Sequence, residues 1–94
     1  MKKYELVLLL SEDLKSEEQD KITDKIKKDI KDGEGKVVEE KDMGKRELMS
    51  LVKKQSKAIF KYFVLEIPTE NMSGFRRKLQ LNDNLLRYLL VGKE

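Results

Sequence analysis

The side chains that could perform chemistry in this chain are carboxylates and amines, because the sequence contains neither cysteine nor histidine. The chain therefore has no thiolate nucleophile, no zinc-thiolate site and no imidazole, the usual general base near neutral pH. Adjacent carboxylates occur at Glu17-Glu18 and Glu39-Glu40. Their segments predict a solvated helix start and an edge strand, so we interpret both pairs as surface residues. We expect no catalysis and no metal site.

No glycine-rich phosphate-binding loop is present. Gly33-Glu34-Gly35 lacks the third glycine and the following helix of a dinucleotide-binding motif. An acylphosphatase-like enzyme would need an anion-binding loop after the first strand, where the acidic Ser11-Glu12-Asp13 opposes phosphate binding. Phe60 and Tyr62 invite comparison with the stacking aromatics of an RNA-recognition motif. Residues 57–63 lack both glycines of that motif, so the comparison fails.

Clusters of basic side chains are more informative. Residues 1–35 carry 8 basic and 10 acidic side chains, whereas residues 36–94 carry 13 basic and 8 acidic ones. Lys and Arg clusters are what the neutralisation of nucleic-acid phosphates requires. The candidates are Lys2-Lys3, Lys45-Arg46 and Lys53-Lys54 with Lys57. We expect them to converge, because the N-terminus and the hairpin between the second and third strands should be neighbours in the sheet. Arg76-Arg77-Lys78 we interpret as the solvated outer side of a helix.

The length of the chain limits the number of domains, and its hydropathy limits the kinds of protein that it can be. The chain has 94 residues, of which 41% are charged and 38% hydrophobic, and this length supports one domain with one core. No apolar run approaches the roughly 18–20 residues of a membrane span. The apolar run after the basic start is too short for a secretory signal. We expect a soluble, intracellular protein with a single domain over residues 1–94.

The first part of the chain predicts a strand followed by a helix. Tyr4–Leu10 is a short apolar run whose length favours a buried strand. Ser16 and Gln19 have the spacing of a capping box. The helix predicted over 16–31 carries three isoleucines at every fourth residue: Ile22, Ile26 and Ile30. Gly33-Glu34-Gly35 predicts the helix end, because glycine accepts the left-handed conformation found there.

The rest of the chain predicts two strands, a helix and a last strand. In order, these are an exposed strand over 36–52 that is irregular around Gly44, a hairpin loop over 53–57, a strand over 58–67, a short helix capped by Thr69 or Asn71, and a strand over 85–91. This βαββαβ order predicts an α+β fold of the split βαβ type. We expect a four-stranded antiparallel sheet with two helices on one face.

The predicted strands contain more apolar residues than one covered face can use. A sheet covered on one side should alternate apolar and polar residues along its strands, and the first and third strands do not. The expected core is Leu6, Leu8, Ile26, Ile30, Leu65, Phe75, Leu79 and Leu90. The surplus on the open face is Val7, Leu9, Phe60, Tyr62, Leu89 and Val91. Such a patch usually marks an interaction site, and we predict a protein-docking face. The alternative is a surface that tolerates a few apolar residues.

Several short motifs follow one another along the chain. They are a Met-basic-basic-Tyr-Glu start, Gly35-x-Val37, Gly44-Lys45-Arg46-x-Leu48, the lysine hairpin, Glu66-x-Pro68 and Leu81-x-Asp83-x-Leu85-x-Arg87-Tyr88. In this order and spacing the chain resembles the bacterial small-subunit ribosomal protein S-six (S6) family over essentially its whole length. The resemblance implies a ferredoxin-like fold, a place on the platform of the cytoplasmic ribosome's small subunit, and no catalysis or cofactor. It also implies binding to small-subunit ribosomal RNA as a pair with ribosomal protein S-eighteen (S18).

The resemblance also implies which basic residues lie towards RNA: Lys2, Lys3, Lys45, Arg46, Lys53 and Lys54. Leu48–Val52 departs from the family's Leu-Ala-Tyr-Pro-Ile, and only Gly92-Lys93-Glu94 follow the last predicted strand where many members carry a tail. Contacts made by those two segments are not carried over. The alternative function is a ferredoxin-like regulatory or protein-interaction module that dimerises through its open sheet face. Salt-sensitive binding to ribosomal RNA discriminates between the two.

Overall fold

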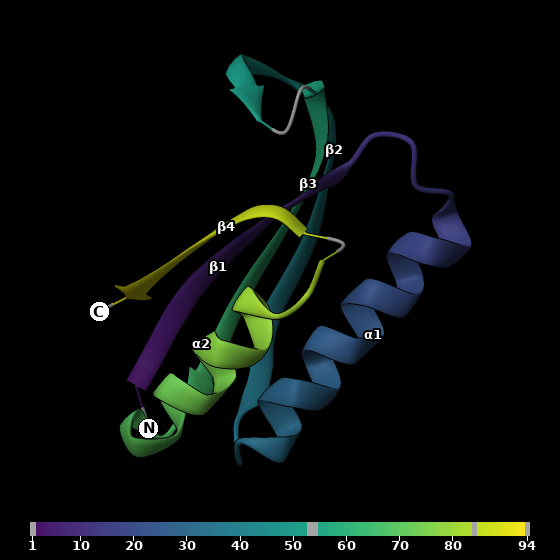
Figure 1. Cartoon of the computed structure of the whole chain (residues 1–94). Helices are drawn as coiled ribbons and strands as arrows, with labels where there is room; N and C mark the ends of the chain where they lie inside the picture. The colour runs from purple at the N-terminus through teal and green to yellow at the C-terminus, as the bar shows by residue number, and fades with distance from the viewer. Residues whose placement is uncertain (1, 53–54, 84, 94) are drawn as a thin grey trace.

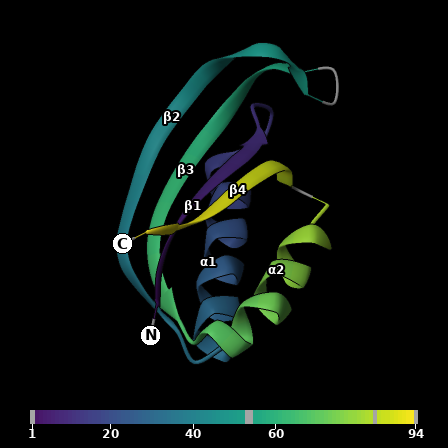
Figure 2. The same ribbon diagram turned by 90° about the vertical axis from the view of Figure 1, so that its left-hand side faces the viewer.

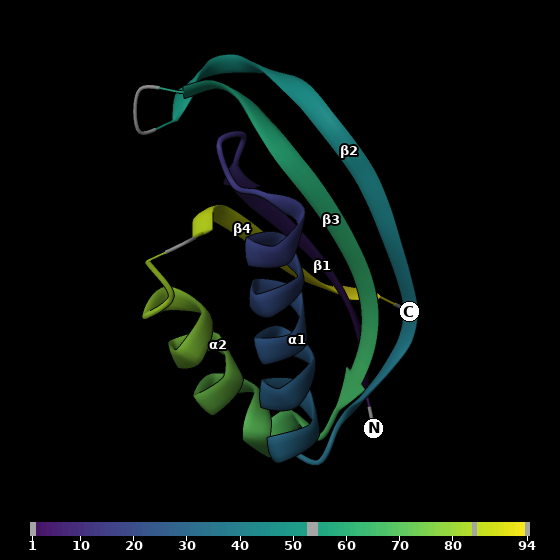
Figure 3. The same cartoon turned by 90° about the vertical axis from the view of Figure 1, so that its right-hand side faces the viewer.

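The computed structural model describes residues 2–52, 55–83 and 85–93, and the side chains of all of these except 49–52 and 55. Its elements are β1 (Lys2–Ser11), α1 (Ser16–Asp32), β2 (Lys36–Val52), β3 (Gln55–Ile67), a 3-10 turn (Thr69–Asn71), α2 (Met72–Gln80) and β4 (Leu85–Lys93). The strands form one antiparallel sheet in the order β2-β3-β1-β4. Both helices lie on one face of this curved sheet (Figures 1 and 3). The predicted ferredoxin-like α+β fold is confirmed.

Alternation along the two central strands sorts the core from the open face. Leu6 of β1 lies opposite Phe63 of β3 and Leu90 of β4, and all three side chains are buried beneath the helices. Side chains of a strand point to opposite faces in turn, so every second residue of β1 and β3 enters this layer. The predicted assignment of strand faces is correct.

The helices close the core with apolar stripes at helical spacing. The buried residues of α1 include Ile22, Ile26 and Ile30, and those of α2 are Met72, Phe75 and Leu79. All eight predicted core residues belong to one buried cluster: Leu6, Leu8, Ile26, Ile30, Leu65, Phe75, Leu79 and Leu90. No helix in the described parts of the chain is long and apolar enough to span a membrane.

The start of α1 differs from the prediction by one residue. Ser16 is the first helical residue, and the residue before it, Lys15, occupies the N-cap position. The Lys15 backbone N–H donates to Glu18 Oε1 at 3.1 Å, and Gln19 Nε2 donates to the Leu14 carbonyl at 3.0 Å. The predicted Ser16 and Gln19 box was therefore wrong, since the acidic side chain that bonds back to the backbone is Glu18.

The end of α1 uses its glycines for close packing. The left-handed residue there is Glu34, with φ of 64°, whereas Gly33 has φ of −84°. A Cβ on Gly33 would lie 2.8 Å from Ile67 Cδ1, and a Cβ on Gly35 would collide with the Glu66 carbonyl oxygen. The glycines let α1 end directly against β3. Their predicted role as left-handed residues was wrong.

Two boundaries in the second part of the chain also differ from the predictions. β3 begins at Gln55, so the predicted loop over 53–57 was too long at its C-terminal end. Asn71 precedes α2 but makes no capping bond. Its Nδ2 donates instead to the Gly33 carbonyl at 2.8 Å, which links the start of α2 to the end of α1. Thr69 lies in the 3-10 turn and not at the cap.

The backbone of β2 is irregular around Gly44, as predicted. Its register against β3 shifts between Val37 and Glu39, between Asp42 and Gly44, and between Glu47 and Val52. Gly44 has φ of +76°, a conformation that other residues adopt only at a cost. The Gly44 N–H donates to Asp42 Oδ1 at 2.9 Å. This β-bulge reorients the outer part of β2.

Replacing Leu8 with alanine should reduce the free energy of unfolding by ~2–5 kcal/mol, because a large side chain is lost from a packed core. Leu8 is fully buried in the layer between β1 and the helices. Urea denaturation of Leu8→Ala measures the change. Leu81→Ala is the matched control, since Leu81 is 73% exposed. Equal unfolding midpoints for the two variants would contradict the assignment of the core.

Candidate protein and RNA interfaces

The apolar open face forms one continuous surface on three adjacent strands. Val7 of β1 lies opposite Tyr62 of β3 on one side and Leu89 of β4 on the other. Leu9 lies opposite Phe60, and Val91 lies opposite Glu5, two residues before Val7. The six predicted residues therefore share one face by strand alternation: Val7, Leu9, Phe60, Tyr62, Leu89 and Val91. This is the face of the sheet without helices (Figures 2 and 3).

The exposed apolar area of this open face is concentrated on β4. Leu9 and Val64 are buried by their neighbours although neither belongs to the core cluster. Leu89 is 58% exposed and Val91 is 43% exposed, whereas Phe60 and Tyr62 are half-buried. The most exposed apolar side chains of the open face are therefore those of β4, and the two aromatic residues are partly covered.

A hydrogen bond fixes Tyr62 on the open face. Its hydroxyl donates to Glu5 Oε2 at 2.7 Å across the β1–β3 pair. This bond, with partial burial and the nearby carboxylates of Glu5 and Glu39, raises the pKa of Tyr62 to about 12, because each of them disfavours the phenolate. The strand alternation predicted the position of Tyr62, but the partnership with Glu5 depends on the β1–β3 register.

The predicted basic clusters lie at opposite ends of the sheet. Lys2 pairs with Ile67 at the end of β3, whereas Lys45 pairs with Ile59 near its start. These positions are eight residues apart along β3, or roughly 26 Å at about 3.3 Å per residue. The predicted convergence was wrong, because β1 runs antiparallel to β3 and begins where β3 ends (Figure 1). Lys2 and Lys3 are exposed at their own end.

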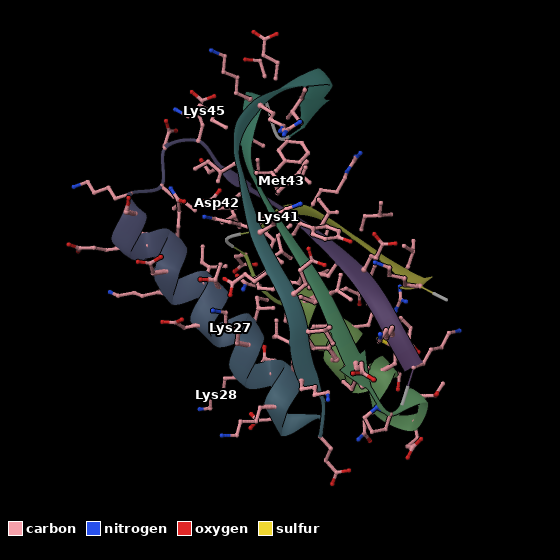
Figure 4. The ribbon with its side chains drawn as sticks, turned by 180° about the vertical axis from the view of Figure 1, so that it is seen from behind. Lys27, Lys28, Lys41, Asp42, Met43 and Lys45 are labelled. Carbon is pink, nitrogen blue, oxygen red and sulfur yellow. The ribbon has the colours of Figure 1, made fainter. Side chains whose placement is uncertain are left out.

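Lys45 and Arg46 point to opposite faces of β2. Lys45 pairs with Ile59, a residue of the core layer, and Arg46 pairs with Ala58 of the open face. Figure 4 shows Lys45 on the side of β2 that faces α1, with Asp42, and Met43 on the other side. Arg46 Nε donates to the Met43 carbonyl at 3.2 Å. Both side chains are exposed. Lys53 and Lys54 lie outside the described residues.

A buried lysine supports this end of the sheet, and the sequence analysis missed it. Lys61 Nζ lies 2.7 Å from Asp42 Oδ2, and Lys61 is only 9% exposed. The hydrogen bond from Lys61, followed by that from the Gly44 N–H, lowers the pKa of Asp42. A charge taken out of water requires such a partner. Lys61 interrupts an apolar strand, which is the one signal that could have revealed the pair.

The four-stranded antiparallel sheet with two helices on one face defines a ferredoxin-like α+β protein. The chain belongs to the ribosomal protein S6 family, whose model, described as Ribosomal protein S6, matches residues 3–92. It is thus a component of the small subunit of the cytoplasmic ribosome and takes part in translation. The predicted family resemblance is confirmed.

Individual relatives agree with this assignment. The chain is 31% identical over 88 residues to the small ribosomal subunit protein bS6 of Rickettsia felis and 30% identical to that of Rickettsia canadensis. Each match covers 94% of this chain and 73% of the relative. The fold is similar to that of 30S ribosomal protein S6 from Thermotoga maritima, with a TM-score of 0.92 at 17% identity, covering 98% of this chain and 87% of that one.

The ring resonances of Tyr62 should titrate at about pH 12 in the folded protein. Its ordinary pKa is 10.0, so the protonated phenol should contribute stability that is fully present below pH 10 and lost as the pH rises through 12. An NMR titration measures the folded value. Glu5→Ala should lower it, because the acceptor is removed. A Tyr62 pKa that is the same with and without the Glu5 carboxylate would contradict the hydrogen bond.

Proposed function

We propose that this small-subunit protein binds ribosomal RNA jointly with ribosomal protein S18, and that its open sheet face receives S18. The observation that carries the proposal is the continuous apolar surface over β3, β1 and β4, which no described element covers. Membership of the S6 family places the protein in the small ribosomal subunit. The resemblance to the S6 family supplies S18 as the partner.

The open face has the composition of a docking surface. Its centre is Val7 between Tyr62 and Leu89, and charged residues such as Lys41 and Arg87 border it on both sides. An apolar centre with aromatic anchors and a polar rim is typical of protein interfaces. The hydrogen bond between Tyr62 and Glu5 holds one anchor in place before binding, which reduces the entropy lost on association.

The outer part of the β2–β3 ribbon supports an RNA contact. β1 ends at Ser11 opposite Ala58 of β3. Beyond this point β2 and β3 remain paired with each other alone and form a two-stranded ribbon (Figure 2). Lys45 and Arg46 lie where this ribbon leaves the sheet, one on each face. Their opposite directions suit an RNA that curves around the ribbon, where each side chain neutralises a different phosphate.

Phe60→Ala or Tyr62→Ala should weaken S18 binding by ~2 kcal/mol or more, because aromatic anchors carry a large share of interface energy. Leu89→Ala should also weaken it, since Leu89 is 58% exposed and free to be covered. Calorimetry with S18 alone measures the affinity. Leu81→Ala, which alters an exposed leucine of the α2 end, is the control. Undiminished S18 binding by a folded Phe60/Tyr62 double variant would refute the docking face.

Lys45→Ala/Arg46→Ala should weaken binding to small-subunit ribosomal RNA and flatten its salt dependence. Each phosphate contact adds about 0.7–0.9 to the slope of log affinity against log salt. Because the two residues face opposite sides, each single variant should account for part of the loss. Lys21→Ala/Lys28→Ala, which removes two exposed charges from α1, is the control. Equal salt slopes for wild type and the Lys45/Arg46 variant would remove this ribbon from the RNA footprint.

The same experiments distinguish the proposed function from a module that dimerises through the open face. Such a module would self-associate in sedimentation, would lose this association in the Phe60/Tyr62 double variant, and would bind neither S18 nor ribosomal RNA. S18 binding and salt-dependent RNA binding by the wild-type protein support the ribosomal role.

A further inference from the structure

The basic cluster of α2 divides into two groups with different surroundings. Lys78 Nζ lies 3.7 Å from Asp29 Oδ1 and 3.9 Å from Asp32 Oδ2 of α1, so this lysine joins the two helices. Arg76 and Arg77 are exposed and line a different side of α2. Within the described residues, neither guanidinium forms an ion pair with a carboxylate. The three residues were predicted to form one solvated face. In the structure Lys78 connects the helices through ion pairs, whereas Arg76 and Arg77 are exposed and form no ion pair with the described residues.

The two arginines line a groove of about 430 Å³ between α2 and the start of β1. Tyr4, a buried residue of β1, contributes the lining on the sheet side. The other lining residues are Thr69 of the 3-10 turn and Met72, Ser73 and Gln80 of α2. No carboxylate lines this groove among the residues that the structure describes. We call it the α2 groove.

A third cation lies beside the same tyrosine. Lys2 Nζ is 5.7 Å from the centroid of the Tyr4 ring, at the same end of the sheet as the first turn of α2 (Figures 1 and 2). Lys2 forms no ion pair within the described parts of the chain. Lys3 and Lys93 pair with each other across β1 and β4 at this end of the sheet, but strand alternation puts them on the open face with Val7 and Val91, away from the groove. Lys2, Arg76 and Arg77 form a group of cations that is separate from Lys45 and Arg46.

We infer that the α2 groove binds the sugar–phosphate backbone of ribosomal RNA. The planar guanidinium groups of Arg76 and Arg77 match phosphate oxygens in pairs. Hydroxyl and amide side chains, here Thr69, Ser73 and Gln80, are common donors and acceptors to phosphate and ribose. Within the described residues Lys2, Arg76 and Arg77 form no ion pair, so their charge is available to a polyanion, and the open-face apolar surface is not involved. The inference rests on the proposed function and adds a second RNA contact to it.

The α2 groove and the Lys45–Arg46 contact lie at opposite ends of the sheet. The groove opens at the end of the sheet where β1 begins, whereas Lys45 lies opposite Ile59 at the other end. The longest dimension of the molecule is 36 Å. An RNA that reaches both places must therefore pass along most of the protein, or two separate RNA segments must meet there.

The first test compares salt slopes with S18 present and small-subunit ribosomal RNA as the probe. Arg76→Gln/Arg77→Gln should lower the slope by about 1–2, at about 0.7–0.9 for each lost phosphate contact, and weaken binding about tenfold. Arg76→Lys/Arg77→Lys should keep more of the slope, because the charge remains while the paired geometry is lost. Lys21→Gln/Lys28→Gln removes the same charge from α1 and should change the slope much less. Unfolding midpoints confirm that all variants are folded.

The second test locates the RNA directly. Because the chain contains no cysteine, Ser73→Cys places a single thiol in the groove for attachment of an iron chelate that cleaves nearby RNA. Asp24→Cys places the same probe on the exposed surface of α1. Assembled with S18 on the RNA, the protein probed at residue 73 should cut the RNA at defined nucleotides, and the protein probed at residue 24 should cut it weakly or elsewhere.

The outcomes separate this inference from the proposed function. Wild-type protein that fails to bind ribosomal RNA would overturn both. Wild-type binding with an Arg76/Arg77 slope equal to that of the Lys21/Lys28 control, and no defined cleavage from residue 73, would overturn the α2 groove alone. Loss of affinity for S18 without RNA in the Arg76/Arg77 variant, with the salt slope unchanged, would assign the groove to a protein contact and also overturn it.

Discussion

The structure depends on one constraint, which is that two helices cover a single face of a four-stranded sheet. Ile22, Ile26 and Ile30 of α1 and Phe75 and Leu79 of α2 meet the inward residues of β1 and β3 in one buried cluster. Burial of each such side chain contributes about 1.5–3 kcal/mol, and these contributions offset the conformational entropy lost on folding. Because the helices occupy one side only, the other face of the central strands is left for another use.

The two faces of the sheet differ in how completely their apolar side chains are buried. The helix-covered face holds the core, whereas the open face keeps Leu89 and Val91 exposed while Leu9 and Val64 are closed in by their neighbours. The open face is thus ordered before any partner arrives, with Tyr62 held by Glu5. The basic side chains also divide into two groups, those that form ion pairs within the fold and those that do not. Lys61 and Lys78 form ion pairs with carboxylates of the fold, whereas Lys2, Arg76 and Arg77 form none with the residues that the structure describes.

Sequence patterns predicted what depends on local periodicity. The alternation in β1 and β3 identified the core and the open face, and the isoleucine repeat identified the buried side of α1. Details that depend on tertiary register were missed. The N-cap lies one residue earlier than predicted, at Lys15, and the side chain that bonds back to its backbone is Glu18 in place of Gln19, because the turn of chain entering α1 determines which side chain reaches the backbone. Lys2 and Lys45 proved distant, because β1 runs antiparallel to β3 and therefore begins where β3 ends, a consequence that the predicted antiparallel sheet already contained. The division of Arg76 and Arg77 from Lys78 required the rotation of α2 against Asp29.

The construction of β2 has a consequence for the free protein. β2 is the longest strand, with 17 residues, and it forms one edge of the sheet. An exposed edge offers unpaired backbone groups to which a strand of another molecule can add. This edge is irregular, because its register against β3 shifts three times and the backbone bulges at Gly44. It also carries the exposed charged residues Glu39, Glu40 and Lys41. Such an edge is a poor template for fibre growth, so the molecule can present a long strand to solvent without polymerising along it.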